Sequence, residues 1–266
     1  MTAIERGADG SPGRIHLHRE DGIARLVIDN PTRRNSMDLA LRDVFHDLLA
    51  EALDDPEVRV LILTGAGGHF CAGGDVQGMQ ETAVECRARL QRLHRIVRLI
   101  AFAEKPVIAA TEGVVAGNGL SFAAASDIVV TASDARFMSA FVRIGLVPDT
   151  GALWLLPRRM GLGRAKLLMM SGKPMSGTEA VASGLAEVET EPGGALARAE
   201  EIAADLMKVA PLAVGMTKAL IARNPETLDE ALKAEIDAQA VLFTTEDFAE
   251  GRAAFAEKRP PDFKAR

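Results

Sequence analysis

Three short segments hold the residues most able to do chemistry, and the first contains an isolated acid. Asp149 lies between Pro148 and Thr150 in "RIGLVPDTGALWLLP", residues 143–157, which is otherwise mostly apolar and includes the chain's only tryptophan, Trp154. Asp is common in tight turns, which is the simpler interpretation. The alternative is a general base, because apolar neighbours withhold water from a carboxylate and strengthen it as a proton acceptor. This segment by itself favours the turn, so the rest of the chain has to decide.

The other two segments are rich in glycine. "GAGGHFCAGGDVQGM" spans residues 65–79, and "GVVAGNGLSFAAASD" spans 113–127 with Gly117-Asn118-Gly119 leading into an Ala-rich helix. Glycines at a strand end let the backbone approach a ligand and leave N–H groups unpaired, and the first amides of a helix also point outward unpaired. Each segment alone fits a flexible loop or a tight turn equally well. Brought together by the fold, the two could form an oxyanion hole.

Composition excludes several classes of protein. The 266 residues carry a formal net charge of −6, so a basic surface for nucleic acid is not expected. The five histidines are scattered and Cys71 and Cys86 form no CxxC pair, so neither a metal nor a bound cofactor is expected. No apolar run approaches the roughly 18 residues of a membrane span, and the first residues show no signal peptide. We expect a cytoplasmic protein with reduced thiols.

Apolar periodicity predicts an α/β fold followed by helices. Apolar runs ending at glycine are typical of strands covered on both faces, and apolar spacings of three and four are typical of amphipathic helices. Strands that alternate with helices indicate parallel pairing. We expect a flexible N-terminus (1–14), an α/β core (15–190) and a helical C-terminal region (191–266). Within the core we expect a hairpin at 14–30, helices at 36–55, 82–102 and 117–127, and strands at 58–65, 105–113 and 127–132.

Several motifs, in this order and spacing, resemble the enoyl-CoA hydratase/isomerase (crotonase) superfamily. They are "FCAGGD", "KPVIAATEGVVAGNG", "SDIVV", "GLVPDTG" and "EDFAEGRAAFAEKRPPDFK", and the resemblance runs from about residue 15 to 264. It implies a spiral of ββα units with a helical trimerisation region at the C-terminus. It also implies that an acyl-CoA thioester carbonyl is held between two backbone amides, which by position belong to Gly74 and Asn118. Coenzyme A would enter as part of the substrate.

The sequence departs from the hydratases of this family at both catalytic positions. Those enzymes use two glutamates, and the matching residues here are Ser121 and Phe141. In related isomerases a single acid occupies the position of Asp149, and the stretch around it is similar to the "GLxPDxGGxWLLPR" of the epoxyphenylacetyl-CoA isomerases. The resemblance therefore favours an isomerase in which Asp149 moves a proton along the acyl chain. Ser121, Phe141 and Trp154 are expected to line the substrate pocket.

Other activities stay open. One is a hydratase in which Ser121 and Asp149 manage water, and another is a hydrolase or dehalogenase with Asp149 as nucleophile. The dehalogenase needs an aromatic cradle, which a chain with no tyrosine and one tryptophan supplies poorly. A non-catalytic relative that binds CoA or RNA is a further alternative. The acidic net charge opposes RNA binding, and the intact amide loops oppose an inactive scaffold.

The resemblance also assigns the residues that bind coenzyme A. Arg33 and Arg34 in "NPTRRNSM" match a basic loop near the phosphates, and the backbone of Ala72 lies near the adenine. Phe263 and Lys264 match an aromatic–lysine pair that often reaches the adenine from a neighbouring subunit. Asp75 ends the first loop beside this group, where we expect it to cap the following helix.

The remaining polar residues near the loops are interpreted as structural. Glu112 and Asp127 flank the second loop at positions typical of turn acids. His69 and Cys71 are close in sequence to the first loop, but adjacency alone does not make a catalytic dyad. We expect them to support the loop.

The helices after residue 195 predict assembly. They present more apolar faces than one small α/β core can cover, so we expect a homotrimer or a dimer of trimers. Sedimentation at micromolar protein concentration should give the mass of three or six chains, and a monomer would contradict the prediction.

Overall fold

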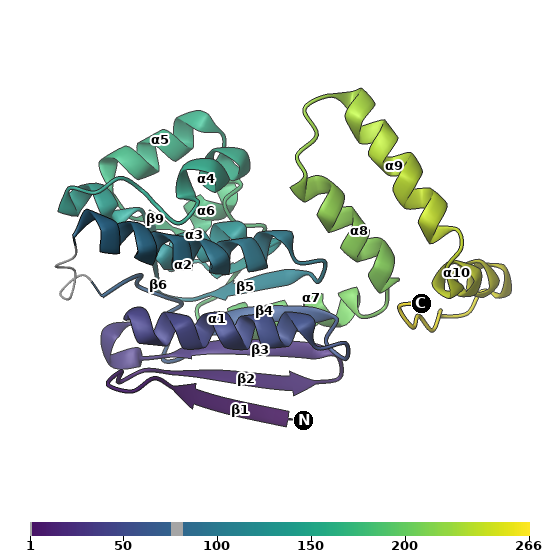
Figure 1. Cartoon of the computed structure of the whole chain (residues 1–266), viewed down its shortest axis with the longest axis horizontal. Helices are drawn as coiled ribbons and strands as arrows, with labels where there is room; N and C mark the ends of the chain where they lie inside the picture. The colour runs from purple at the N-terminus through teal and green to yellow at the C-terminus, as the bar shows by residue number, and fades with distance from the viewer. Residues whose placement is uncertain (1, 76–81) are drawn as a thin grey trace.

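A seven-stranded sheet forms the base of the computed structural model, which describes residues 2–75 and 82–266 (Figure 1). The strands run in the order β1-β2-β3-β4-β5-β7-β10. The first three are antiparallel and the others parallel to their neighbours. Their bounds are β1 Thr2–Gly7, β2 Arg14–Glu20, β3 Ile23–Asp29, β4 Val60–Gly65, β5 Val107–Thr111, β7 Ile128–Ala132 and β10 Val188–Thr190.

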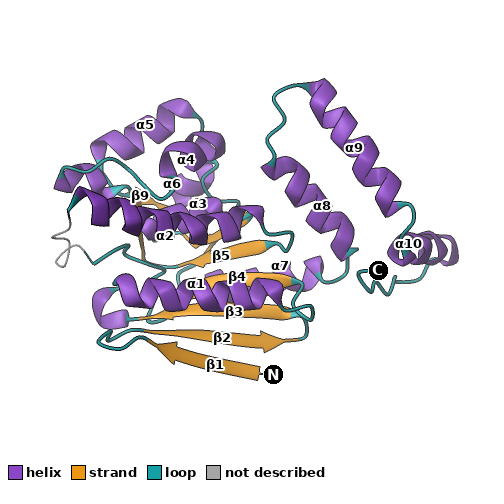
Figure 2. Cartoon of the chain, viewed as in Figure 1, coloured by secondary structure: helices purple, strands orange, loops and turns teal. Residues whose placement is uncertain are grey.

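Helices cover both faces of this sheet, as the continuous apolar strands require (Figure 2). Alternate residues of β4 point to opposite faces, so Leu61 and Leu63 join the cluster with helices α1 (Leu39–Asp54) and α2 (Ala83–Phe102). Val60 and Ile62 join the other cluster, against Ala195, Ala199 and Ala203 of helix α7 (Ala195–Leu206). The predicted helix at 82–102 begins as expected, because Thr82 and Glu85 form a capping box.

A second, three-stranded sheet stands beside the loops that carry the candidate chemistry. It contains β6 (Val114–Ala116), β8 (Arg136–Met138) and β9 (Met175–Ser176). Around it are 3₁₀ helices η1 (Pro31–Arg33) and η2 (Ala140–Ile144) and helices α3 (Asn118–Ala125), α4 (Ala152–Met160), α5 (Leu162–Ser171) and α6 (Gly177–Ser183). The sequence did not predict these three short strands, because two- and three-residue strands leave no periodic pattern.

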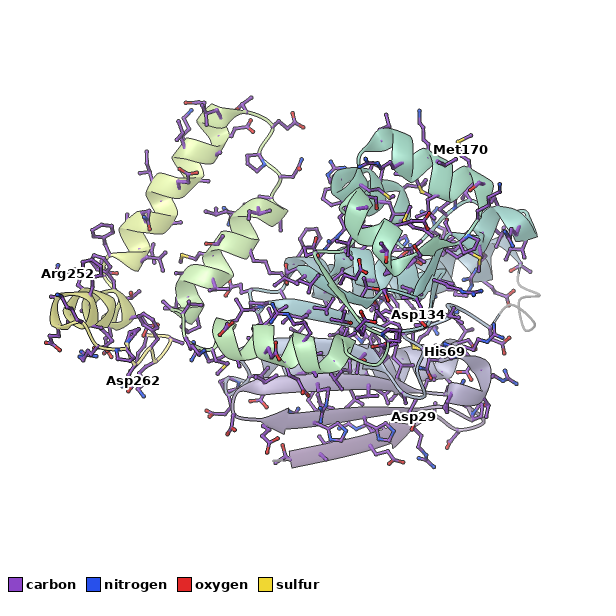
Figure 3. The ribbon with its side chains drawn as sticks, turned by 180° about the vertical axis from the view of Figure 1, so that it is seen from behind. Asp29, His69, Asp134, Met170, Arg252 and Asp262 are labelled. Atoms are coloured by element: carbon purple, nitrogen blue, oxygen red, sulfur yellow. The ribbon has the colours of Figure 1, made fainter. Side chains whose placement is uncertain are left out.

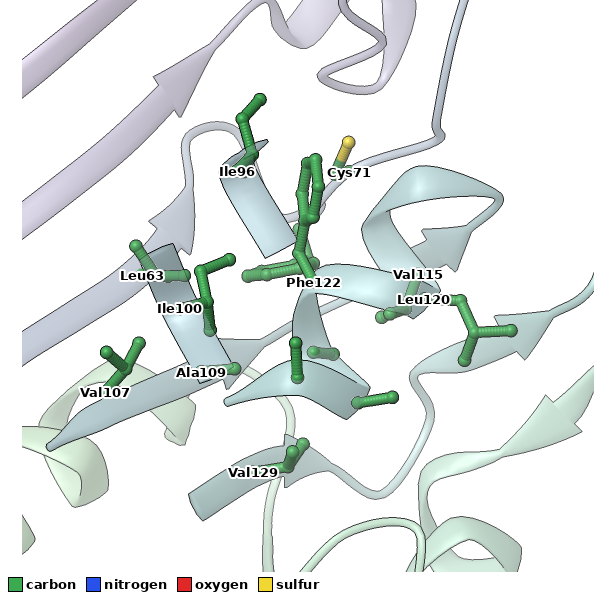
Figure 4. Packing of buried hydrophobic residues seen from close by; sticks show 14 of the residues in the cluster. Leu63, Cys71, Ile96, Ile100, Val107, Ala109, Val115, Leu120, Phe122 and Val129 are labelled. Atoms are coloured by element: carbon green, nitrogen blue, oxygen red, sulfur yellow. The ribbon is translucent and has the colours of Figure 1, made fainter. Parts of the chain in front are cut away.

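Helix α3 lies inside the molecule. All eight of its residues are buried, and small alanines let it pack between α2, α4 and the sheets. Figure 4 shows Phe122 of this helix next to Cys71 of the first glycine loop, and the Phe122 ring stacks on Phe45 of α1 at 5.6 Å between centroids. A helix whose residues are mostly apolar and buried on every side is expected in a core. Its N-terminal residues are thereby fixed from every direction.

The C-terminal helices leave this core. Helices α8 (Pro211–Ala222), α9 (Leu228–Leu242) and α10 (Glu246–Glu257) lie to one side of it (Figure 1). No residue of α9 is buried. Large apolar side chains are exposed along these helices and the turns between them: Ile221, Leu228, Leu232, Ile236, Val241, Phe243 and Phe255. Across residues 2–75 and 82–266, no helix combines the length and the apolar character needed to cross a membrane.

Two of the predicted boundaries are wrong. The expected flexible N-terminus contains strand β1, which pairs with β2 along its whole length, from Thr2 opposite Arg19 to Gly7 opposite Arg14. The polar sequence did not predict this strand, because an edge strand can be held by backbone hydrogen bonds alone. The core also does not end at residue 190, since α7 covers the second face of the sheet. The segment that leaves the core starts with α8.

A buried lysine attaches α8 to the core. Nζ of Lys218 donates to the carbonyl oxygens of Ile100 and Lys105, each at 2.9 Å, and lies 2.7 Å from Oδ2 of Asp127. Asp127 also accepts the N–H of Val107, which confirms it as a structural acid. Burial lowers the pKa of Lys218, and the charge of Asp127 opposes that shift.

Lys218→Met should therefore destabilise the protein. The substitution removes the Lys218 donor from two carbonyls and from the Asp127 carboxylate, which keeps only the N–H of Val107, while the 29 % exposure of the Asp127 side chain lets water replace part of the loss. We expect the free energy of unfolding to fall by about 1–3 kcal/mol. Lys208→Met is the matched control, because Lys208 forms a similar but exposed pair with Asp205, at 2.8 Å, and should change stability by less than about 0.5 kcal/mol. Chemical denaturation of both variants distinguishes them, and equal effects would contradict a special role for Lys218.

Candidate active site

The first glycine loop is held on both sides by backbone hydrogen bonds. On one side the N–H of Cys71 donates to Val114 O, and the N–H of Ala116 donates to Cys71 O, so the loop pairs with β6. On the other side the N–H of Met37 donates to Gly73 O and the N–H of Asp75 donates to Met37 O. In a parallel bridge of this kind the residue between the two bonded groups, Gly74, directs its own N–H away. Among the described residues that amide has no acceptor.

The second glycine loop lies directly against the first. A Cβ added to Gly73 would lie 3.0 Å from Ala116 O and 3.4 Å from the backbone nitrogen of Asn118. Gly117 adopts φ 54° and ψ −121°, a conformation that essentially only glycine tolerates. Asn118 is the first residue of α3, so its N–H has no acceptor within the helix. The fold therefore brings together the two loops whose sequences predicted an oxyanion hole.

The Asp149 segment packs against the start of α3. The hydroxyl of Ser121 donates to the backbone oxygen of Asp149 at 3.3 Å. The side chain of Asp149 is half-buried, and its Oδ1 accepts from the Thr150 hydroxyl at 2.6 Å. The same hydroxyl lies 3.2 Å from Oδ1 of Asn118. Asp149, Thr150 and Asn118 of the second loop thus form one hydrogen-bonded group, with Thr150 in the middle.

Thr150 is a site residue that the sequence did not reveal. It is completely buried and has a left-handed backbone with φ 54°. A β-branched residue is a genuine outlier in that region, at a cost of about 1–3 kcal/mol that the surrounding structure must impose. The residue type gives no hint of this, because Thr is a poor choice for a left-handed position. The adjacent Gly151, with φ 85°, was the only local signal of an unusual turn.

Arg42 is a second missed residue. It is only 4 % exposed, and its Nε donates to Met37 O beside the first loop. Burial, and secondly the charge of Arg89, lower the pKa of Arg42, while Cys71, Asp149 and Asp38 oppose the shift. The charge of Arg42 therefore reaches Asp149. A signal existed in the sequence, because position 42 falls on the apolar face of α1.

The expected apolar enclosure of Asp149 is wrong for the single chain. The apolar side chains around it point outward, with exposed fractions of 49 % for Ile144, 45 % for Leu146, 73 % for Val147 and 60 % for Leu153. Trp154 is 45 % exposed, and the Arg158 guanidinium covers its ring at 3.6 Å. Sequence spacing alone could not tell a buried apolar segment from an outward-facing one. The assignment of Trp154 to the substrate pocket stays a prediction.

Ser121 and Phe141 are both buried. Ser121 is completely inaccessible and engaged with the backbone of Asp149. Phe141 is 8 % exposed, and its carbonyl accepts the N–H of Leu146, which closes the turn before the Asp149 segment. Both residues therefore hold the segment around Asp149, and neither of them carries a carboxylate.

The residues interpreted as structural make structural contacts. Nδ1 of His69 accepts the N–H of Val114, on the side of the molecule seen in Figure 3. Glu112 accepts the backbone N–H groups of Gly193 and Ala195 at the start of α7. Burial raises the pKa of the Cys71 thiol to about 11, so this cysteine is a neutral thiol and not a nucleophile.

The residues assigned to coenzyme A fall into two groups. Arg33 pairs with Asp75 at 2.7 Å, and the carbonyl of Arg34 accepts the N–H of Ala72, so these four residues lie together beside the first loop. Thr82 is the N-cap of α2, and the cap predicted for Asp75 stays a prediction, because the residues that directly follow it lie outside the described ones. Of the segment predicted as "GAGGHFCAGGDVQGM", residues 76–79 lie outside the described residues.

The second group is far from the loops in a single chain. Phe263 packs near Gly251 of α10, and the N–H of Lys264 donates to Asp247. Figure 3 shows Asp262, next to Phe263 in the chain, beside the C-terminal helices and well apart from His69, which lies in the core. One chain therefore does not bring Phe263 and Lys264 to Ala72, and their contact with the same coenzyme A stays a prediction.

Together, the spiral of strands and helices and the two adjoining amide loops define a crotonase fold. Solved structures agree. The chain superposes on an enoyl-CoA hydratase from Polaromonas sp. JS666 with a TM-score of 0.89, at 35% sequence identity over 94% of this chain and 99% of that one. An enoyl-CoA hydratase from Bacillus anthracis gives a TM-score of 0.90 at 29% identity, over 95% and 99% of the two chains.

Sequence comparison gives the family. The family model described as enoyl-CoA hydratase/isomerase matches residues 18–266, and this chain belongs to that family of enzymes. It is 36% identical over 259 residues to the 1,2-epoxyphenylacetyl-CoA isomerase of Escherichia coli K12, covering 94% of this chain and 97% of the relative. It is 35% identical over 252 residues to a crotonyl-CoA hydratase of Syntrophomonas wolfei, with the same two coverages. The relatives thus include an isomerase as well as hydratases.

The two amide loops predict opposite outcomes for two substitutions. Gly74→Pro deletes a backbone donor and should lower kcat on an enoyl-CoA by about 10²–10³-fold. Asn118→Gly keeps the backbone N–H and should retain most of the activity. Steady-state kinetics, with acyl-CoA binding measured separately, checks both. If Asn118→Gly abolished turnover while acyl-CoA still bound, the side chain and not the amide would be the working group.

Proposed function

We propose that this enzyme is an enoyl-CoA isomerase that uses Asp149 as its single acid/base. The observation that carries the proposal is the position of the Asp149 carboxylate. It is linked through Thr150 to Asn118 at the start of α3, while the two positions that carry glutamate in the family's hydratases are Ser121 and Phe141. One carboxylate suffices for an allylic shift, whereas ordinary hydration in this family uses two.

The amides of Gly74 and Asn118 supply the first requirement of the reaction. They hold the thioester carbonyl oxygen of a 3-enoyl-CoA and stabilise the negative charge that develops when the neighbouring carbon loses a proton. Their advantage over water is that both are already fixed, because the loops are hydrogen-bonded to β6, to Met37 and to each other's backbone. No reorganisation is needed at the moment of reaction.

Asp149 supplies the second requirement. It takes a proton from C2, and the electron pair of that C–H bond delocalises over the double bond and the thioester to give a dienolate. The same carboxyl group then returns the proton to C4, which leaves the double bond between C2 and C3. Asp149 ends as a carboxylate, and no water, metal or redox cofactor enters the balance. General acid–base catalysis of this kind typically contributes about 10²–10⁴-fold.

Substrate binding is proposed to involve more than one chain. Arg33 and Arg34 would contact the phosphates of coenzyme A, with Ala72 and Asp75 nearby. Phe263 and Lys264 would approach the adenine from a neighbouring subunit, because α10 lies away from the loops of its own chain. The exposed apolar side chains of α9 and of the Asp149 segment support a homotrimer or a dimer of trimers.

Hydration is the competing reaction, since a crotonyl-CoA hydratase is among the relatives. Ser121 is a poor group to hold the attacking water, because its hydroxyl is completely buried and donates to Asp149 O. Phe141 has no proton to transfer. The buried Ser121 hydroxyl and the absence of an acid at position 141 both support isomerisation over hydration.

Asp149→Asn tests the proposal. The change keeps the side chain's size and removes its basicity, so turnover of a 3-enoyl-CoA should fall by about 10²–10⁴-fold. Binding of acyl-CoA should barely change, because the amides and arginines remain. The kcat profile of the wild type should also have a low-pH limb that the variant lacks.

Deuterated water identifies the reaction. In it the wild type should shift the double bond of a 3-enoyl-CoA, and it should add no water to a 2-enoyl-CoA. Epoxyphenylacetyl-CoA as a further substrate separates a ring rearrangement from a linear shift. A near wild-type rate in Asp149→Asn would mean that the carboxylate is a turn residue only, and the proposal would fail.

A further inference from the structure

Thr150 combines three unusual properties at the proposed acid/base. It is completely buried, its backbone is left-handed at φ 54°, and its hydroxyl faces two oxygen acceptors. These are Oδ1 of Asp149 at 2.6 Å and Oδ1 of Asn118 at 3.2 Å. Close by, Nδ2 of Asn118 is buried and has no hydrogen-bond partner within residues 2–75 and 82–266. Backbone binding of the carbonyl by Asn118 leaves all of these side-chain contacts unexplained.

The hydroxyl has one proton, so it can donate to only one of the two oxygens. The shorter distance and the negative charge both favour Asp149. Thr150 then presents its lone pairs to Asn118, and only a donor can satisfy them. Half a turn of the Asn118 amide about χ2 exchanges its oxygen and nitrogen. This places the unpartnered Nδ2 where it can donate to Oγ1 of Thr150.

We infer that Asn118, Thr150 and Asp149 form a directed hydrogen-bond chain, in which Thr150 is a positioning residue for the acid/base. Nδ2 of Asn118 donates to Oγ1 of Thr150, and that hydroxyl donates to Oδ1 of Asp149. Among the described residues no hydrogen bond reaches Oδ2 of Asp149. Oδ2 is therefore the oxygen that exchanges the proton with the acyl chain. This inference rests on the proposed acid/base role of Asp149.

Asp149 is held both at its backbone and at its side chain. Ser121 holds the backbone oxygen of Asp149 and Thr150 holds Oδ1, so the plane of the carboxyl group is set relative to α3. When Oδ2 accepts the proton from C2, the hydroxyl proton of Thr150 stays on its own oxygen. Its bond to the neutral acid is weaker than its bond to the carboxylate, and it regains strength when the proton moves on to C4. The threonine thus favours release of the proton to product.

Threonine suits this side-chain role, although it does not suit the left-handed backbone at position 150. Glycine or asparagine would adopt φ 54° more easily, but neither offers a hydroxyl. The methyl group of threonine also restricts rotation about χ1, which keeps the hydroxyl between its two partners. The strained backbone is explained if the position is selected for its side chain.

Three variants at position 150 separate hydroxyl, shape and strain. Thr150→Ser keeps the hydroxyl and should keep most of kcat. Thr150→Val keeps the shape and removes the hydroxyl. Thr150→Gly removes the hydroxyl and relieves the backbone strain, so it is the second test of the hydroxyl if the valine variant fails to fold. Both should lower kcat by about 10–100-fold, the usual effect of losing a hydrogen bond to a charged group. KM should change less than kcat.

Two further readouts distinguish positioning from a merely structural role. Thr150→Ser should retain the kcat that Thr150→Gly loses, because only serine keeps the hydroxyl, whereas a merely structural role would follow the backbone strain, which glycine relieves. Asn118→Gly should cost less than Thr150→Gly, and the double variant should be no slower than Thr150→Gly alone, since Asn118 acts through Thr150.

The outcomes separate this inference from the proposed function. If Asp149→Asn is inactive but Thr150→Gly has wild-type kcat, the hydrogen-bond chain is overturned and the acid/base role stands. Additive effects of Asn118→Gly and Thr150→Gly would also overturn it, by showing that the two residues act independently. If Asp149→Asn is active, the proposed function fails first, whatever the Thr150 variants show.

Discussion

The close approach of two glycine loops is the contact on which the rest of the structure depends. Gly73 lies so near Ala116 and Asn118 that any side chain there would have to displace backbone atoms. Gly119 meets Cys71 in the same way. Backbone can approach backbone this closely only where side chains are absent. These two segments are held at that separation by the small sheet, the buried helix α3 and the loop around Met37. The same helix α3 also positions Asp149, through Ser121 and Asn118.

Much of this arrangement could be predicted because it rests on strong local patterns. The parallel strands are continuous apolar runs, and α1 and α2 have clear helical spacing, so their presence followed from periodicity. The two amide loops could be recognised because glycine is chosen there for a backbone reason that no other residue meets. The neighbourhood of Asp149 and Asn118, in contrast, came from resemblance to a family, since nothing in the spacing of residues 118 and 149 implies contact.

The features that escaped prediction depend on long-range packing. Strand β1 has a polar sequence and is held by backbone pairing with β2. Helix α7 joins the core through three alanines, whose small side chains give a weak periodic signal. The backbone of Thr150 opposes its own residue preference, so the surrounding packing must impose it. The direction of the apolar side chains near Asp149 is likewise a tertiary property.

The C-terminal helices carry a consequence for how the chain acquires its structure. Helix α9 buries no residue, and an isolated helix of 15 residues is marginal in water. Within the chain it packs on α8 alone among the helices with several contacts, whereas α1 to α7 have partners in the core. In the assembly proposed above, a neighbouring chain would cover α9, and until that chain arrives α9 would stay open to proteases and to amide hydrogen exchange. Concentration, and not sequence alone, would then decide how much of this protein is helical.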